Sequence, residues 1–218
     1  MPSRLIHYLI AEEIAKTNKQ FNRDRFVYGV LLPDLSMHED GSYDRAHYGE
    51  NLIENKIRGI NWIKFNDKYH HRMICDSLYL GYYCHLIMDA LWFSKIVDKF
   101  IGIHPYAERK TYYQKSYEDY KILNYLLSKE YSLQYHIPMI DNIDIEEVNL
   151  SLRNTYFEEL KEDITNPSIA DKKDLKLYPY DVIIDYIKQA RELCINELEA
   201  FYKGIEFMNP RTLYTNGE

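Results

Sequence analysis

Residues 67–102 limit the fold of this 218-residue chain more than any other stretch. Apolar side chains recur there at three- and four-residue spacing, which predicts a helix, and they occupy several faces of it. Such a helix must be surrounded by other elements, because it would otherwise expose a large apolar surface to water. Gly102 and Pro105 should end it. We therefore expect this helix to lie at the centre of the core.

The rest of the chain also favours helices. Only 7 prolines and 8 glycines interrupt it, and the alternation typical of strands is scarce. The sequence predicts an all-α fold with one compact multi-helix domain over residues 1–218 and no domain linker. Further helices are expected over 3–18, 25–31, 106–131, 143–163 and 179–207, and residues 208–218 are expected to be a frayed tail.

Composition and charge exclude several functional classes. Lys and Arg number 27 against 34 Asp and Glu, so a long nucleic acid is not an expected partner. The sequence contains no run of about 18 apolar residues that would predict a transmembrane helix. The first 18 residues resemble an amphipathic helix and not a signal peptide, so we expect a cytoplasmic protein. Three cysteines, Cys75, Cys84 and Cys194, lie in apolar patterns and suggest reduced, buried thiols.

Within the predicted central helix, His85 and Asp89 are four residues apart and therefore share one face. One interpretation is a buried His–Asp hydrogen bond that serves packing. The other is a metal site, because a carboxylate buried in an apolar helix needs a compensating cation or hydrogen-bond donors. Imidazole nitrogen and carboxylate oxygen are both common zinc ligands. Two ligands alone do not make such a site.

Three further polar residues occur where they could join this pair. Pro33 disfavours helix at the preceding residue, which predicts that Asp34 lies in a turn. His7 lies beside the apolar stripe of the first helix. His47 follows a polar loop and should lie near the start of a helix, and His38 in the same loop is an alternative to it.

Five short features of the chain follow one another in an order that resembles the zinc-dependent phospholipase C family. They are His7, Leu32-Pro33-Asp34, His47-Tyr48, Gly81 and His85-x-x-x-Asp89. The related fungal zinc nucleases share this order. The resemblance covers roughly the first hundred residues, and it implies a helical domain with a polar zinc site in its core that hydrolyses phosphodiester bonds.

The resemblance also implies a role for each residue. His47, His85 and Asp89 would surround one zinc ion, and His7 would bind a second, with Asp89 bridging the two. Asp34 would be a further ligand or the base that orients the attacking water.

Departures from the family limit the number of metal ions. Lys95 stands where the family has a histidine for a third zinc, and His104 with Glu108 matches the later part of that site only formally. We therefore expect one or two zinc ions. The roles of Asp119, on the tyrosine-rich helix, and of Trp92, either a pocket wall or a core residue, stay open.

The sequence thus supports a zinc-dependent phosphodiester hydrolase, similar to phospholipase C, that uses metal-activated water. Its partner would be a phospholipid head group or a small phosphodiester. The alternative is a non-catalytic helical protein whose His/Asp cluster binds a structural metal, or forms a core hydrogen-bond network, and supports partner binding. Oligomeric state leaves no readable mark in the sequence.

Overall fold

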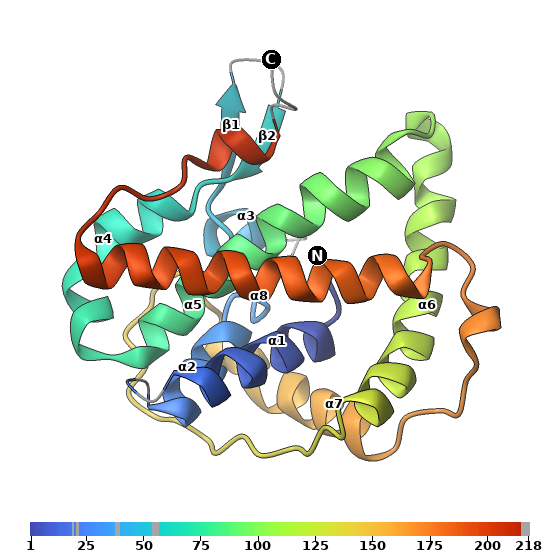
Figure 1. The fold of residues 1–218 in the computed structure, drawn as a ribbon, viewed down its shortest axis with the longest axis horizontal. Helices are drawn as coiled ribbons and strands as arrows, with labels where there is room; N and C mark the ends of the chain where they lie inside the picture. Colours follow the sequence, from blue (N-terminus) through green and yellow to red (C-terminus); the bar gives the residue numbers. More distant parts are fainter. Residues whose placement is uncertain (19, 21, 38–39, 54–56, 215–218) are drawn as a thin grey trace.

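The computed structural model describes residues 1–18, 20, 22–37, 40–53 and 57–214, and these form a helical assembly with one small sheet (Figure 1). The longer helices are α1 (Arg4–Thr17), α2 (Arg23–Leu31), α4 (Trp62–Cys75), α5 (Ser77–Trp92), α6 (Arg109–Glu130), α7 (Arg153–Thr165) and α8 (Tyr180–Lys203). Short elements are α3 (Ser42–Ala46), η1 (Phe93–Gly102), η2 (Tyr106–Glu108), η3 (Leu150–Leu152), η4 (Lys172–Asp174) and η5 (Pro210–Leu213). The predicted all-α class is confirmed.

Helix α5 lies at the centre of the core, as its apolar sequence predicts. Residues 78–92 are all buried, and α5 packs against α1, α2, α4 and α8. The prediction of one continuous helix over 67–102 is wrong in one respect, because the helix is interrupted at Asp76, between α4 and α5. The Asp76 carboxylate accepts a hydrogen bond from the Leu78 amide at 3.0 Å and so caps a new helix. Beyond Trp92 the chain continues as the π-helix η1.

Two glycines bring α2 and α5 into backbone contact. A Cβ atom at Gly29 would lie 1.9 Å from the Leu78 carbonyl oxygen, and one at Gly81 would lie 2.0 Å from the Phe26 carbonyl oxygen. Neither position can therefore hold a larger residue without separating the helices. This close approach is what brings the backbone of α2 to the side chains of α5.

Helix α1 begins where the sequence predicts. The Ser3 hydroxyl accepts a hydrogen bond from the Ile6 amide at 3.3 Å and caps the helix, and the same hydroxyl donates to Asn124 on α6 at 3.0 Å. The buried face of α1 faces α2, α5 and α8. The start of α1 is thereby fixed beside α6.

A two-stranded antiparallel sheet, β1 (Gly49–Ile53) and β2 (Ile57–Ile60), was not predicted. It changes the setting of His47, which lies at the C-terminal end of α3 and just before β1, and not at the start of a helix. The main chain reaches this strand through Tyr48, whose φ of 51° is in the left-handed region. The expected position of His47 is therefore corrected.

Other sequence expectations also need correction. Helix in the 143–163 region begins only with η3 at residue 150. The expected frayed tail contains the 3₁₀ helix η5, in which Pro210 is buried, and the Tyr214 hydroxyl donates to the Ala90 carbonyl at 3.4 Å. Residues 215–218 lie outside the described part of the chain. Cys84 and Cys194 are buried as expected, but Cys75 is exposed.

Among the described residues, no helix has the length and apolar character needed to cross a bilayer.

Candidate metal centre

The five residues singled out in the sequence come together in the core from four separate elements. His7 comes from α1, Asp34 from the turn after α2, His47 from the end of α3, and His85 with Asp89 from α5. The side chains of His7, His85 and Asp89 are completely buried, and those of Asp34 and His47 are exposed by 4% and 1%. The structure thus assembles all the predicted ligands in one buried cluster.

Asp89 lies close to all three histidines. Its Oδ1 is 3.1 Å from His7 Nε2, and its Oδ2 is 3.5 Å from His47 Nε2 and 3.8 Å from His85 Nε2. Asp34 is a second shared carboxylate, with Oδ1 3.8 Å from both His47 Nε2 and His85 Nε2, and Oδ2 3.4 Å from His7 Nδ1. Both acids therefore face the same small space between the imidazole rings.

Backbone carbonyls determine which nitrogen of two histidines is free. His85 Nδ1 lies 2.7 Å from the Val30 carbonyl oxygen, and His47 Nδ1 lies 2.9 Å from the Tyr43 carbonyl oxygen. A carbonyl only accepts, so both Nδ1 atoms carry a proton, and the Nε2 atom of each ring points into the cluster. These two Nε2 atoms lie 3.2 Å apart. In the neutral form of both rings, two Nε2 lone pairs would face each other, and a cation between them would satisfy both.

Several polar atoms of this cluster have no hydrogen bond among the described residues. They are both ring nitrogens of His7, Oδ1 of Asp34 and both carboxylate oxygens of Asp89. Buried polar atoms left in this condition are costly in a folded protein. A bound divalent cation would satisfy them, and the donor set of imidazole and carboxylate is one that zinc accepts. The residues present therefore fit a zinc site.

The electrostatics of the cluster agree with this fit. Burial would raise the pKa of Asp89, but His85 and His7 lower it to about 2. Burial and the charge of His7 lower the pKa of His85 to about 3. Burial disfavours the charged form of His7, but the carboxylates of Asp34 and Asp89 raise its pKa to about 9. In the protein chain alone, a proton on His7 thus supplies the positive charge that a metal ion would bring.

The imidazole nitrogens and carboxylate oxygens that could bind a metal form two overlapping groups. Within each group these atoms lie within 4.8 Å of one another. One group is His7, His85 and Asp89, and the other is Asp34, His47 and His85. Because they share His85, the two groups describe neighbouring positions in one cluster. This geometry is compatible with one ion or with two adjacent ions.

Comparison with protein families agrees with this geometry. A model of the family described as zinc dependent phospholipase C matches residues 6–189 of the chain, which include all five clustered residues. The chain belongs to the zinc-dependent phospholipase C family. No curated protein and no solved structure matches it.

Two tyrosines that the sequence did not indicate hold ligands of the His/Asp cluster in place. The Tyr156 hydroxyl donates to Asp34 Oδ2 at 2.9 Å. The Tyr43 ring stacks on the His47 ring with centroids 4.0 Å apart. No local pattern could indicate the Tyr156–Asp34 contact, because the two residues are 122 positions apart in the sequence.

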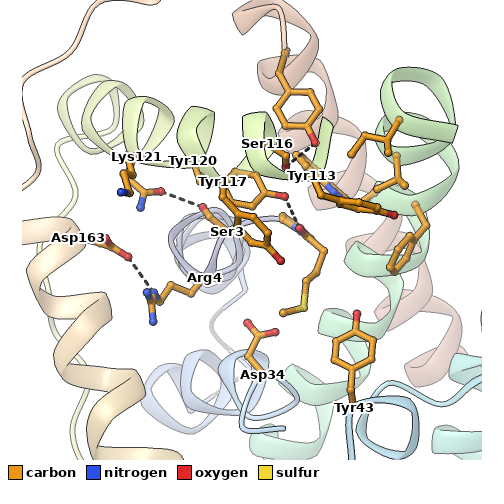
Figure 2. Close-up of a pocket in the computed structure, with 18 of the residues that line it drawn as sticks. Ser3, Arg4, Asp34, Tyr43, Tyr113, Ser116, Tyr117, Tyr120, Lys121 and Asp163 are labelled. Atoms are coloured by element: carbon orange, nitrogen blue, oxygen red, sulfur yellow. Dashed lines mark hydrogen bonds and ion pairs between the residues drawn. The ribbon is translucent and has the colours of Figure 1, made fainter. Parts of the chain in front are cut away.

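A pocket of about 710 Å³ reaches the cluster at Asp34. Figure 2 shows Asp34 and Tyr43 at one side of the pocket and Tyr113, Tyr117 and Tyr120 at the other. Its remaining walls are largely apolar and include Trp92. The Trp92 side chain is also fully buried, so this residue is both a pocket wall and a core residue. The buried cluster thus faces a cavity large enough for a small molecule.

Other candidates from the sequence lie elsewhere. Asp119 is buried, but its carboxylate accepts hydrogen bonds from the backbone amides of residues 176–178, so its role is to hold that segment against α6. The His104 ring stacks on the Tyr112 ring, and the Glu108 side chain is exposed. Neither His104 nor Glu108 belongs to a group of potential metal ligands among the described residues. Lys95 is exposed. His38 lies outside the described residues.

Proposed function

We propose that this protein is a zinc-dependent hydrolase of phosphodiester bonds that acts like a phospholipase C. The observation that carries the proposal is the convergence of Nε2 of His47 and Nε2 of His85, 3.2 Å apart, with two buried carboxylates. The family match and the adjoining pocket support catalysis over a structural metal site.

Each residue of the cluster has a proposed role. His47, His85 and Asp89 would hold one zinc ion, and His7 would hold a second, with Asp89 shared between the two. Bound zinc would lower the pKa of water toward neutrality and offset negative charge on the phosphate. The carbonyls of Val30 and Tyr43 fix the rings of His85 and His47, so that Nε2 points into the cluster.

Asp34 has a different position, because it lines the pocket as well as the cluster. Its pKa is held well below the usual range; burial opposes this shift, but the charges and hydrogen bonds of the surrounding histidines outweigh it. An ionised carboxylate at the boundary between ligand atoms and pocket can orient a water molecule and accept its proton. We therefore assign Asp34 as a metal ligand or as the base for the attacking water.

The pocket favours a substrate with an apolar portion. Phe93, Val97 and Ile101 of η1 line it together with tyrosines of α6. A phospholipid would place its phosphate near Asp34 and its glycerol and acyl portion along this wall. A small phosphodiester with an apolar group is the alternative substrate, and a long nucleic acid fits neither these walls nor the acidic composition.

Tyr156→Phe should reduce hydrolysis without removing the metal. The substitution leaves the aromatic ring but removes the hydroxyl that donates to Asp34 Oδ2 at 2.9 Å. Loss of such a supporting hydrogen bond to a site residue costs about 10- to 100-fold in activity. Steady-state kinetics and elemental analysis of the same preparation would measure both effects. Unchanged kcat and KM would show that this hydrogen bond does not orient Asp34 for catalysis.

Zinc analysis together with a phosphodiesterase assay tests the proposed function directly. Protein purified without chelator and without a histidine tag should contain one or two zinc ions and hydrolyse a phosphodiester. His85→Ala should lose both properties, because His85 belongs to both groups of ligand atoms. His104→Ala is the matched control and should keep both, since its ring stacks on Tyr112 away from the cluster.

Two other outcomes would overturn the proposal. Retained zinc without hydrolysis of any phosphodiester would support the alternative of a structural metal. A folded His85→Ala variant with unchanged zinc content and hydrolysis would show that the cluster is not the metal site.

A further inference from the structure

The helical hairpin formed by η1 and α6 exposes large apolar side chains at its turn. Ile103 is 71% exposed and Tyr106 is 88% exposed, and Tyr113 and Tyr117 on α6 are 41% and 65% exposed. We call these four residues the hairpin patch. In Figure 1 the turn between the green η1 segment and α6 projects from the body of the molecule. An exposed group of large apolar side chains is a candidate interaction surface.

The hairpin patch is continuous with the mouth of the pocket. Tyr113 and Tyr117 belong to the patch and also line the pocket, which extends from there to Asp34. Ile103 and Tyr106 lie beyond the pocket and do not line it. Whatever covers this patch therefore lies directly over the entrance to the proposed catalytic site.

The turn that presents Ile103 and Tyr106 is held by specific contacts. The Arg109 guanidinium donates to the Gly102 carbonyl at 2.7 Å and to the His104 carbonyl at 3.0 Å. The His104 ring stacks on Tyr112 with centroids 3.5 Å apart and an interplanar angle of 7°. These interactions fix the backbone of the turn, so the apolar side chains are presented outward on an ordered support.

The hairpin differs in charge from the rest of the chain. Residues 93–121 contain six Lys or Arg against four Asp or Glu, whereas the whole chain carries a formal charge of −7. In the described part of the chain, no ion pair is formed by Lys95, Lys99, Lys110 or Lys115. Basic side chains beside exposed aromatic and aliphatic groups are typical of proteins that bind the surface of an anionic bilayer.

We infer that the hairpin patch docks on a phospholipid bilayer containing anionic lipids and places the pocket mouth against the lipid head groups. The inference rests on the proposed function, because docking would bring a phospholipid substrate to the site. Binding to the bilayer does not itself require catalysis. Ile103 and Tyr106 would enter the interfacial region, and the positive charge of the hairpin would attract anionic head groups. A second copy of the chain is a poorer partner, because a symmetric contact would bring the two basic hairpins together.

Vesicle co-sedimentation of the zinc-loaded full chain tests this docking. We expect binding to phosphatidylcholine vesicles that contain phosphatidylserine, and weaker binding when salt is raised or phosphatidylserine is omitted. The double variant Ile103→Ser/Tyr106→Ser should lower the partition coefficient at least about tenfold. Lys99→Glu/Lys110→Glu should remove most of the dependence on phosphatidylserine and on salt. Ile74→Ser is the matched control, since Ile74 is 60% exposed at the end of α4.

A water-soluble phosphodiester separates docking from catalysis. The Ile103→Ser/Tyr106→Ser variant should hydrolyse it at the wild-type rate, because neither residue lines the pocket. Vesicle binding by a chain that hydrolyses no phosphodiester would support the docking surface and contradict the proposed function. Hydrolysis of the soluble ester without vesicle binding, or equal binding by the double variant and by Ile74→Ser, would overturn the docking surface alone.

Discussion

Asp89→Asn should abolish zinc binding and hydrolysis together while leaving the fold recognisable. The substitution preserves the shape of the side chain but removes its charge, and it replaces one acceptor oxygen with a donor NH₂ group. Asp89 lies within 3.1 to 3.8 Å of Nε2 of His7, His47 and His85, so the substitution removes the carboxylate that these three Nε2 atoms share. We expect zinc content to fall below about a tenth of the wild-type value and kcat/KM to fall at least about a thousandfold.

Elemental analysis and steady-state hydrolysis of one preparation would measure both losses, and circular dichroism would report the fold. Asp185→Asn is the matched control, because it makes the same chemical change at a side chain of α8 that is 68% exposed. The control should match the wild type in both assays. A metal-replete, fully active Asp89→Asn variant would show that Asp89 neither binds the metal nor bridges two ions.

Helical spacing allowed part of this site to be predicted. His85 and Asp89 lie four residues apart in a helix that the apolar pattern marks as buried, and residues 78–92 are indeed buried throughout. Periodicity also placed His7 beside an apolar stripe on α1, but its role as a ligand was implied by the family resemblance. Periodicity determines which face of a helix is buried, so it can also identify the polar residues that are buried with that face.

Residues that depend on tertiary contacts could not be found this way. Tyr156 meets Asp34 across 122 positions, and Glu147 accepts a hydrogen bond from the Tyr48 hydroxyl across 99 positions. Neither pair leaves a local pattern in the sequence. The sheet of β1 and β2 was missed for a related reason, because its short strands carry no clear alternation of apolar and polar residues.

The position of His47 shows how far a local pattern can mislead. The prediction that it belongs to the cluster agrees with the structure, but the expected helix after it is a β-strand. What fixes the ring is the Tyr43 carbonyl, four residues earlier in α3, and stacking on the Tyr43 side chain. The residue type and its order in the chain were therefore more informative than the expected secondary structure around it.

Gly81→Ala should destabilise the fold and weaken zinc binding, although the substitution adds only one methyl group. The new Cβ would lie 2.0 Å from the Phe26 carbonyl oxygen and 2.8 Å from the Val30 amide nitrogen, and both of these are backbone atoms that no side-chain rotation can move. Helices α2 and α5 would have to separate. Overpacking of this kind costs about 3 kcal/mol in the free energy of unfolding.

The effect should reach the metal centre because the same helix contact orients a ligand. The Val30 carbonyl oxygen accepts a hydrogen bond from His85 Nδ1 at 2.7 Å, and His85 lies one turn after Gly81 on α5. Separation of the helices would lengthen this hydrogen bond and release the ring from the orientation that aims Nε2 at the cluster. Zinc affinity should therefore fall by about 10- to 100-fold in the folded fraction.

Urea unfolding and competitive zinc titration would measure the two effects separately. Gly102→Ala is the matched control, because the nearest atom to its Cβ would be Asp98 Oδ1 at 3.4 Å, an ordinary contact with a movable side chain. Its unfolding free energy should stay within about 1 kcal/mol of the wild-type value, with unchanged zinc affinity. If Gly81→Ala lost stability but bound zinc as tightly as the wild type, the α2–α5 contact would support the fold without orienting His85.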